Sequence, residues 1–398
     1  MAKLKKIGYG YVFLLFFVLS LTSASYRLEI DPPMENENNS LDLEAPNLRT
    51  SDYWDDVSHI WVDGNWSDAA TLDWIQDGAG TWNDPYRIEN LTMNVGNTGS
   101  GIYIANTTEY FIIKNCTIYL SGTAPYDAAI RLFNATNGII ESCDLNNNWM
   151  GINLDESDNI TIRDNNIYEN IQMGIRVYKS DENRIYDNLV TDDGIYGIFL
   201  NAGADENRIY ENTITKNTGT TYGYGIFFSA SCKRNTIHSN EISQNKQGIR
   251  LRQYCSDNVF TENNLKGNSL YGVVLFNNSG YLCENNTFLK NYFETTGGVN
   301  VVDNGTDNKW DNGEIGNYWH DYEGKDEDDD GIGDDPYAIS GTANAIDNYP
   351  IWDDGDEKKE KDDTDDEGPA IPGFPFGFLM GIMSLSVLGL IMLRKFKK

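Results

Sequence analysis

The chain has 398 residues, and its 61 acidic against 30 basic side chains give a formal net charge of −31. This charge argues against a partner that is a nucleic acid or another polyanion bound on a basic face. Three histidines, His59, His238 and His320, are present, and no two of them have the spacing of a zinc or copper site.

The start of the chain has the composition of a secretory signal peptide. Three lysines precede an apolar run over residues 7–21, and small residues follow it. We therefore expect residues 1–25 to direct export and residues 26–52 to form a linker. Export also permits N-glycosylation at sequons such as the Asn-Trp-Ser triplet of Asn65, which predicts a glycoprotein.

Residues 53–100 are expected to form an N-terminal cap and a first coil, and residues 101–316 contain a repeat. Most units have a Gly-Ile-x-apolar motif, as at Gly151-Ile152-Asn153-Leu154, followed by an apolar-x-x-Asn-x-apolar motif whose asparagine is replaced by cysteine or glycine in a few units. The asparagine slot of the second motif is filled in successive units by Asn165, Asn188, Asn212, Asn240, Asn263 and Asn286.

Repeats of this kind, without helical periodicity, predict short strands wound into a solenoid. One coil per unit places equivalent strands about 4.8 Å apart. Equivalent asparagines then stack and hydrogen-bond in a structural ladder that satisfies buried turn groups. We therefore predict an all-β fold, a parallel β-helix of about nine or more coils counted from the repeats.

Three longer connections, at residues 121–127, 218–224 and 292–297, fall at one corner of the predicted coil. Insertions gathered on one side of a solenoid are typical of a binding side. Neutral variation in loop length is the alternative.

The outward column of the Gly-Ile-x-apolar strands is rich in aromatic and arginine side chains. Such side chains stack on sugar rings and donate hydrogen bonds to hydroxyl and carboxylate groups, so we hypothesise a glycan-binding face. An amphipathic outer face without a ligand is the alternative. The column has no carboxylate and Asp155 alone follows it, so the acid pair of a glycosidase is missing there. The predicted face comprises Tyr103, Arg131, Arg176, Phe199, Phe227 and Arg250.

Four of the five cysteines lie in equivalent positions of neighbouring repeats. Cys116 and Cys143 share the asparagine slot, and Cys232 and Cys255 each lie three residues before an asparagine. An extracellular location permits oxidation of each pair to a disulfide. In-register strands, however, usually hold Cβ atoms farther apart than a relaxed disulfide requires. The sequence therefore leaves two interpretations of these pairs open, disulfides or buried thiols.

Residues 317–352 are expected to form a C-terminal cap that contains an Asp-rich loop. Carboxylates at positions 1, 3, 5 and 9 of this loop, with glycine at position 6, match a calcium-binding loop. Tyr337 stands where an EF-hand loop has its last acidic ligand, and a solvated acidic turn is the alternative. We predict calcium as a cofactor, bound by Asp326, Asp328, Asp330, Ile332 and Asp334.

The C-terminal region carries an acidic stretch and then an apolar one. Residues 353–370 are expected to be a solvated stalk. Residues 374–393 carry no charge and are long enough to span a bilayer, and a basic tail follows them. We therefore expect residues 371–398 to anchor an extracellular protein in the membrane, with its C-terminus in the cytoplasm.

The repeats resemble those of right-handed parallel β-helix proteins of the NosD-like and carbohydrate-binding, sugar-hydrolase type. The opening segment 80–88 and the closing segments 316–322, 335–337 and 347–350 are also similar to those of this family. The resemblance implies a right-handed coil and a secreted protein. Residues 372–374 (Pro-Gly-Phe) before the apolar span are similar to an archaeal sorting signal, which implies a sorting peptidase as a partner.

The sequence leaves three functions open. The first is a non-enzymatic surface protein that binds glycans or envelope proteins along one face. The second is a polysaccharide lyase, hydrolase or epimerase with a site under the projecting loops. The third is a NosD-like accessory protein of copper-enzyme maturation, for which the chain has few histidines.

Overall fold

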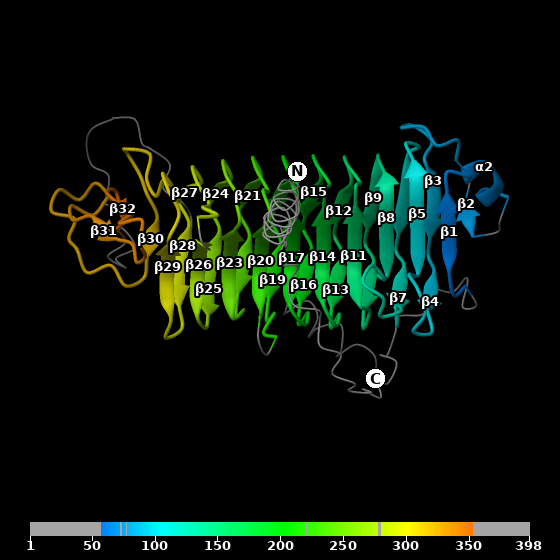
Figure 1. The fold of residues 1–398 in the computed structure, drawn as a ribbon, viewed down its shortest axis with the longest axis horizontal. Helices are drawn as coiled ribbons and strands as arrows, with labels where there is room; N and C mark the ends of the chain where they lie inside the picture. Colours follow the sequence, from blue (N-terminus) through cyan, green and yellow to red (C-terminus); the bar gives the residue numbers. More distant parts are fainter. Residues whose placement is uncertain (1–56, 72–73, 77, 220–221, 278–279, 353–398) are drawn as a thin grey trace, which may run out of the picture.

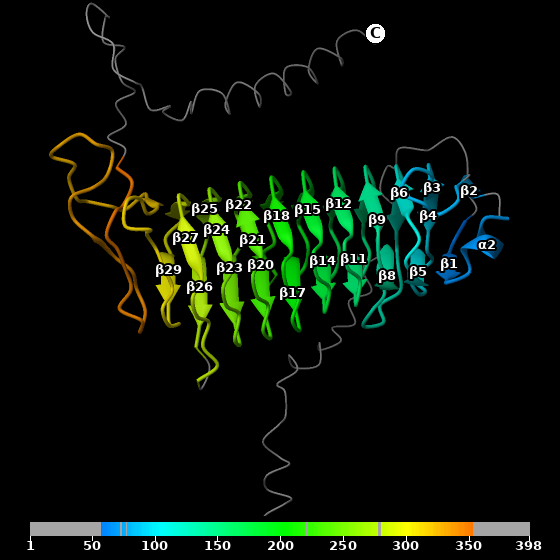
Figure 2. The same cartoon turned by 90° about the horizontal axis from the view of Figure 1, so that it is seen from above.

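The computed structural model describes residues 57–71, 74–76, 78–219, 222–277 and 280–352, which form one elongated β-solenoid (Figures 1 and 2). The predicted signal peptide, linker, stalk and C-terminal span lie outside the described residues. No helix within the described ranges is long and apolar enough to cross a membrane.

Three ten-stranded sheets run along the solenoid, and each coil contributes one strand to each sheet. Sheet A contains β1 (Ile60–Asp63), β5 (Ile102–Thr107), β8 (Ile130–Ala135), β11 (Met150–Asp155), β14 (Met173–Tyr178), β17 (Tyr196–Asn201), β20 (Tyr224–Ser229), β23 (Gln247–Arg252), β26 (Tyr271–Phe276) and β29 (Val299–Asp303). Sheet B contains β2 (Ile75–Gln76), β3 (Tyr86–Glu89), β6 (Phe111–Lys114), β9 (Gly138–Glu141), β12 (Thr161–Arg163), β15 (Arg184–Tyr186), β18 (Arg208–Tyr210), β21 (Thr236–His238), β24 (Val259–Thr261) and β27 (Thr287–Leu289). Sheet C contains β4 (Thr92–Asn94), β7 (Thr117–Tyr119), β10 (Asp144–Asn146), β13 (Asn166–Tyr168), β16 (Leu189–Thr191), β19 (Thr213–Thr215), β22 (Glu241–Ser243), β25 (Asn264–Asn268), β28 (Tyr292–Thr295) and β30 (Tyr318–Trp319).

Apart from β2, which pairs antiparallel with β3, strands of successive coils pair in parallel, which stacks equivalent side chains in columns. In sheet A, Ile152 pairs with Ile130 on one side and with Ile175 on the other, and all three side chains are fully buried. Fully burying an aliphatic side chain of this size contributes about 1.5–3 kcal/mol. The aliphatic columns of the three sheets therefore form one continuous core, and the predicted parallel β-helix of about nine coils is confirmed.

Amide ladders run along the corners of the coil, and there are three of them among the described residues rather than the one predicted. Asn212 Oδ1 accepts from the backbone N–H and the Nδ2 of Asn188, at 3.1 and 2.9 Å. Asn212 Nδ2 donates to Asn240 Oδ1 at 2.9 Å. The first ladder contains Asn165, Asn188, Asn212, Asn240, Asn263, Asn291 and Asn317; the second contains Asn183, Asn207, Asn235, Asn258, Asn286 and Asn308; the third contains Asn148, Asn170, Asp193, Asn217, Asn245 and Asn268.

The assignment of Asn286 to the first ladder is wrong. Asn263 donates to Asn291 instead, and Asn286 accepts from Asn258 in the second ladder. In five coils, asparagines of both ladders lie five residues apart, as at positions 258 and 263. The coil of Asn286 has extra residues between β26 and β27. Because of this insertion, Asn286 lies as far after Asn263 in the sequence as a member of the first ladder would, although it belongs to the second ladder. For the same reason residues 292–297 are not a projecting loop, because Tyr292–Thr295 forms β28.

The residues directly before the ladder positions adopt the left-handed backbone conformation, with positive φ, and this turns the chain at each corner. In one coil, Glu182, Asp187 and Asp192 have φ values of 57°, 54° and 57°. This conformation costs an L-residue about 1–2 kcal/mol. Losing one partner of a buried hydrogen bond costs about 1–3 kcal/mol, and each ladder amide makes several such bonds. The corners are therefore fixed by the buried amides and not by the preferences of the turn residues.

A short helix lies at the N-terminal end of the solenoid (Figure 1). This helix, α2 (Trp66–Ala69), places Trp66 on Tyr86 with 4.7 Å between ring centroids and on Phe111 with 5.6 Å. The indole Nε1 of Trp66 donates to Thr107 Oγ1 at 2.9 Å.

At the other end, the buried Asp347 carboxylate collects hydrogen-bond donors. It accepts from the indole Nε1 of Trp319 at 2.9 Å and from the backbone N–H of Asn317 at 2.8 Å. Burial raises the pKa of Asp347, although these hydrogen bonds oppose the shift. Two short antiparallel strands, β31 (Tyr337–Ala338) and β32 (Ile346–Asp347), hold this carboxylate in place.

Candidate functional site

The outer surface of sheet A carries the aromatic and arginine column that the sequence predicted. Its strands lie side by side along one face of the solenoid (Figure 2). The backbone register confirms that the six predicted residues share one column, which also includes Asn153 and Val274. In coil order the column is Tyr103, Arg131, Asn153, Arg176, Phe199, Phe227, Arg250 and Val274.

Aromatic rings and guanidinium groups lie in contact over the first coils of this face. Trp61, on β1, is 65% exposed, and its ring centroid lies 4.2 Å from that of Tyr103. The Arg131 guanidinium lies 5.1 Å from the centroid of the Tyr103 ring and 5.2 Å from that of the Tyr126 ring. The Arg176 guanidinium lies 5.7 Å from the Tyr126 centroid. These five side chains form one surface, which we call the aromatic–arginine array.

Tyr126 comes from the connection between β7 and β8, which is one of the predicted insertions. Within this loop the Ala124 N–H donates to Asp127 Oδ2 at 3.0 Å. Asn153 Nδ2 donates to the Tyr126 carbonyl at 3.2 Å, which ties the loop to the face. The loop therefore holds Tyr126 over the column.

A polar cluster lies beneath Tyr126. Arg176 is 9% exposed, and its Nη1 donates to Asn153 Oδ1 at 2.9 Å. Asp155, at the end of β11, is 8% exposed. Burial raises the pKa of Asp155 and outweighs the opposing effects of Arg176 and Arg131. Burial lowers the pKa of Arg176, and the Arg131 Nε is buried without a hydrogen-bond partner.

The middle of the face is apolar and closed. Phe199 and Phe227 stack with ring centroids 5.0 Å apart, and they are 4% and 1% exposed. Tyr196 and Tyr224 on the neighbouring outward column pack against them and form a second small core. The prediction that these two phenylalanines present their rings to a ligand is therefore wrong, because their neighbours cover them. Arg250 lies beyond this core, with its guanidinium 5.4 Å from the Tyr224 centroid.

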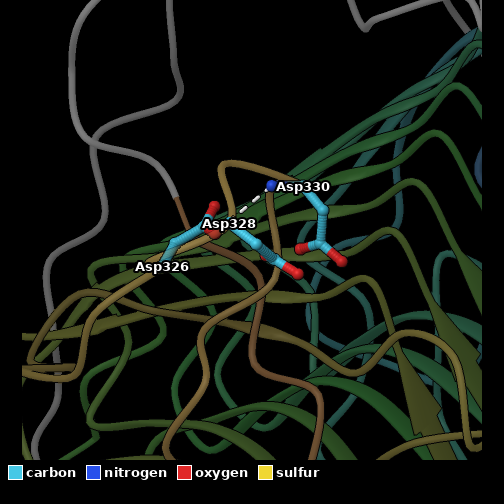
Figure 3. Close-up of side chains that lie close together, drawn as sticks. All are labelled: Asp326, Asp328 and Asp330. Carbon is cyan, nitrogen blue, oxygen red and sulfur yellow. Dashed lines mark hydrogen bonds between the residues drawn. The ribbon is translucent and has the colours of Figure 1, made fainter.

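The acidic loop after β30 brings three of the predicted calcium ligands together. One carboxylate oxygen each of Asp326, Asp328 and Asp330 lies within 4.8 Å of the others (Figure 3). The Gly331 N–H donates to Asp326 at 2.8 Å. The neighbouring Asp330 carboxylate raises the pKa of Asp328 by repulsion. Three converging carboxylates fit a hard cation such as calcium, which prefers oxygen ligands.

The other two predicted ligands stand apart from this trio. Asp334 Oδ2 accepts from the backbone N–H of Glu327 at 2.6 Å. Ile332 forms an antiparallel bridge with Ile351. The structure therefore assembles three of the five predicted ligands around one point.

The five cysteines are buried free thiols, so neither candidate pair is bridged. Cys116 and Cys143 stack in one column and Cys232 and Cys255 in another, which Cys283 extends. Burial raises the pKa of the Cys232 thiol well above its usual value. Parallel neighbours at strand spacing leave these side chains packed in the core rather than bridged.

Two family models match the repeats. Residues 60–214 match the family described as right-handed β-helix region. Residues 218–324 match the family described as periplasmic copper-binding protein (NosD). Together with the parallel coils, the first match makes the fold a right-handed β-helix. No curated protein matches the chain in sequence.

Several solved β-helix structures are similar to this β-helix protein. The periplasmic alginate epimerase AlgG is 17% identical with a TM-score of 0.39, and the match covers 61% of this chain and 63% of the epimerase. The alginate lyase from Paenibacillus sp. str. FPU-7 is 14% identical with a TM-score of 0.46, over 58% of this chain and 87% of the lyase. The Dettilon tailspike protein is 15% identical with a TM-score of 0.40, over 58% of this chain and 55% of the tailspike. The β-helix protein thus spans less than two thirds of the epimerase and of the tailspike.

Sequence reasoning missed two residues of the array. Trp61 lies before the first complete repeat, so no repeat alignment reaches it, although the alternation Ile-Trp-Val-Asp marks an outward position. Tyr126 lies in an insertion, where periodicity gives no direction to a side chain. The exposure of Trp61 and the direction of Tyr126 are visible only in the folded β-helix.

Proposed function

We propose that this β-helix protein binds glycans on the aromatic–arginine array, outside the cell and without catalysing a reaction. The observation that carries the proposal is that three aromatic rings and two guanidinium groups lie in contact on one surface, formed by Trp61, Tyr103, Arg131, Tyr126 and Arg176. Aromatic rings offer flat apolar faces to sugar rings, and guanidinium groups donate paired hydrogen bonds to their oxygens. The packed order of the array also means that little side-chain entropy is lost on binding.

A polysaccharide lyase, hydrolase or epimerase is the second candidate, and Asp155 is the observation that favours it. A buried carboxyl whose pKa is raised suits proton transfer. Glycoside hydrolysis, however, uses two carboxyl groups that face one bond. Asp155 is the one acidic residue within the sheet A strands β8, β11, β14, β17, β20, β23 and β26. We therefore rank binding above catalysis.

A NosD-like role in copper processing is the third candidate, and the family match at residues 218–324 favours it. Within the described ranges, the metal-ligand cluster of three or more side chains is the aspartate trio 326, 328 and 330. Carboxylate oxygens suit calcium, whereas copper sites are typically built from imidazole and sulfur ligands. The ligand chemistry therefore favours calcium.

We infer that calcium is a structural cofactor of the closing segment. Asp326, Asp328 and Asp330 would supply carboxylate oxygens. The same loop is tied to the end of the solenoid, because the Gly331 carbonyl accepts from the Trp352 N–H at 3.0 Å. Neutralising the three carboxylates would therefore stabilise the covering of the last coil, where an open β-helix would otherwise present strand edges.

The location belongs to the same proposal. Export by the predicted signal peptide would place the repeats outside the cell, where glycans and envelope proteins are the available ligands. The predicted stalk, membrane span and sorting signal would display the protein on the cell surface and would make a sorting peptidase a partner. The sequons support a glycoprotein.

The proposal is tested by a glycan array probed with the full-length protein in calcium and in EDTA. We expect retention of a defined set of glycans in both conditions. The array lies on the first coils and the calcium loop lies at the opposite end (Figure 1), so chelation should lower the melting temperature more than it lowers binding. Retention of no glycan in either condition would end the proposal.

A further inference from the structure

The outer face of sheet A has a charge opposite to that of the whole chain. In the ten strands of sheet A, the charged residues are four arginines and three aspartates, namely Arg131, Arg176, Arg250, Arg252, Asp63, Asp155 and Asp303. The chain itself has a net charge of −31. At physiological ionic strength charges more than about 8 Å away are largely screened, so the local arginines decide what binds here. The net charge of the sequence does not reveal this face.

Two of the arginines lie in one preorganised cluster. Arg131 and Arg176 flank Asn153 in the same column, and the Tyr126 ring lies against both guanidinium groups. Arg176 is fixed through Asn153, whose own amide is bonded to the Tyr126 carbonyl. The side-chain entropy of Arg176 is therefore lost on folding and not on binding.

The cluster has more positive charge and more donors than its own residues satisfy. It contains two guanidinium groups, Arg131 and Arg176, and a single carboxylate, Asp155, which leaves one positive charge in excess. Each guanidinium has five N–H donors, and the Arg131 Nε is buried without a partner. A buried donor left unpaired costs about 1–3 kcal/mol. An oxyanion placed between the two arginines would relieve this cost.

We propose that the array is specific for acidic sugars, with the carboxylate of a uronic-acid-type residue bound by Arg131 and Arg176. This inference rests on the proposed glycan binding and adds the substrate class. One excess positive charge matches a monoanion. The exposed ring of Trp61 and the half-exposed ring of Tyr126 lie on either side of Arg131 and offer faces for the neighbouring sugar rings. Asp155 beside the arginines limits the site to a single added negative charge.

The experiment compares polygalacturonate with its fully methyl-esterified form, which has the same backbone without the charge. Calorimetric titration of the full-length protein at fixed ionic strength gives both affinities. We expect the acid to bind at least about tenfold more tightly than the ester, which is about 1.4 kcal/mol. Equal affinities for acid and ester would overturn the charge preference but not the glycan-binding proposal. Binding of neither polymer, with an empty glycan array, would overturn both.

Three substitutions locate the preference. Arg131→Gln should reduce the affinity for the acid about tenfold and the affinity for the ester by less, because only the acid presents a carboxylate to this guanidinium. Arg184→Gln, an exposed arginine on sheet B, is the matched control and should change neither. Asp155→Asn removes the competing carboxylate, so it should strengthen binding of the acid about threefold. A catalytic or hydroxyl-binding Asp155 predicts weaker binding instead, and that result would contradict the proposal.

A folding defect in Arg131→Gln would show as a lowered melting temperature. Arg131→Lys then serves as the second variant, because it keeps the charge and loses the planar fork. It should retain a preference for the acid that is smaller than that of the unmodified protein. The same affinity loss in Arg131→Lys and Arg184→Gln would contradict the assigned site.

Discussion

The Oδ1 atom of Asp193 accepts hydrogen bonds from the Nδ2 and the backbone N–H of Asn170, at 2.9 and 3.0 Å. An aspartate thus occupies one position of the third amide ladder. At an equivalent position Asn217 Nδ2 donates to Asn245 Oδ1 at 2.9 Å. In Asp193, the carboxylate atom Oδ2 stands where asparagine has its Nδ2 donor, and this Oδ2 is buried without a hydrogen-bond partner. Burial raises the pKa of Asp193 well above its usual value, and a protonated carboxyl would restore the missing donor.

Asp193→Asn should stabilise the protein at neutral pH by about 1–3 kcal/mol, because it replaces an unpaired acceptor with a donor. The folded pKa of Asp193 lies above its unfolded value of about 3.9. The contribution of this group to stability is therefore complete below the unfolded pKa and is lost as pH rises through the folded pKa. Denaturant unfolding at pH 4 and pH 8 should show a difference between variant and unmodified protein that grows with pH.

The reverse substitution at a neighbouring position is the control. Asn217→Asp should destabilise the protein at pH 8 more than at pH 4, since it introduces the same buried acid. A difference between Asp193→Asn and the unmodified protein that is constant over pH would contradict a titrating ladder position.

The ladders themselves should contribute strongly to stability. Asn212→Ala removes the acceptor of Asn188 and leaves buried donors and carbonyls unpaired. We expect the unfolding free energy to fall by about 2–5 kcal/mol, the sum of an unpaired group and a cavity. Thr213→Ala, an exposed neighbour on β19, is the matched control and should cost under about 1 kcal/mol. Equal losses in the two variants would show that the ladder is not the source.

The repeat fold could be predicted from the sequence because one residue pattern recurs in most coils. Glycine, isoleucine and asparagine positions recur together, and each has one physical reason to be there. The number of ladders and the place of Asn286 were not predictable in this way. Asn258 and Asn263, which belong to different ladders, lie five residues apart. The extra residues before β27 shift the next coil by the same amount, so the sequence alone does not show which of the two ladders Asn286 joins.

The candidate site was predictable only in part, and the reason is the same for each error. The column of Arg131 and Arg176 follows from strand alternation alone. Exposure depends on neighbours from other coils, as Tyr196 covering Phe199 shows. The direction of Tyr126 depends on an insertion that has no counterpart in most coils. Local pattern fixes which face a residue is on, and tertiary packing fixes whether a ligand reaches it.

Calcium should stabilise the closing segment through the aspartate trio. The melting temperature of the unmodified protein should be higher in calcium than in EDTA, since at about 100 times Kd binding adds about 2.7 kcal/mol. Asp328→Ala combined with Asp330→Ala should abolish this response. Asp334→Ala is the control, because its carboxylate bonds the Glu327 N–H outside the trio, and it should keep the response. Equal melting temperatures of the unmodified protein with and without calcium would exclude the site.

The exposed tryptophan of the array offers the most direct test of glycan binding. Trp61 is 65% exposed next to Tyr103 on sheet A, whereas Trp82 is 72% exposed and lies against Tyr110, outside the array. Trp61→Ala should weaken binding of any retained glycan about tenfold, or about 1.4 kcal/mol, because it removes a flat apolar surface. Trp82→Ala removes a ring of similar exposure outside the array, so it should leave the affinity for the glycan unchanged. A loss of affinity in this variant would mean that removing any exposed apolar ring weakens binding. Titration of both variants, with melting temperatures measured in parallel, separates these effects. If the two variants lose affinity equally, the array on sheet A is not where the sugar binds.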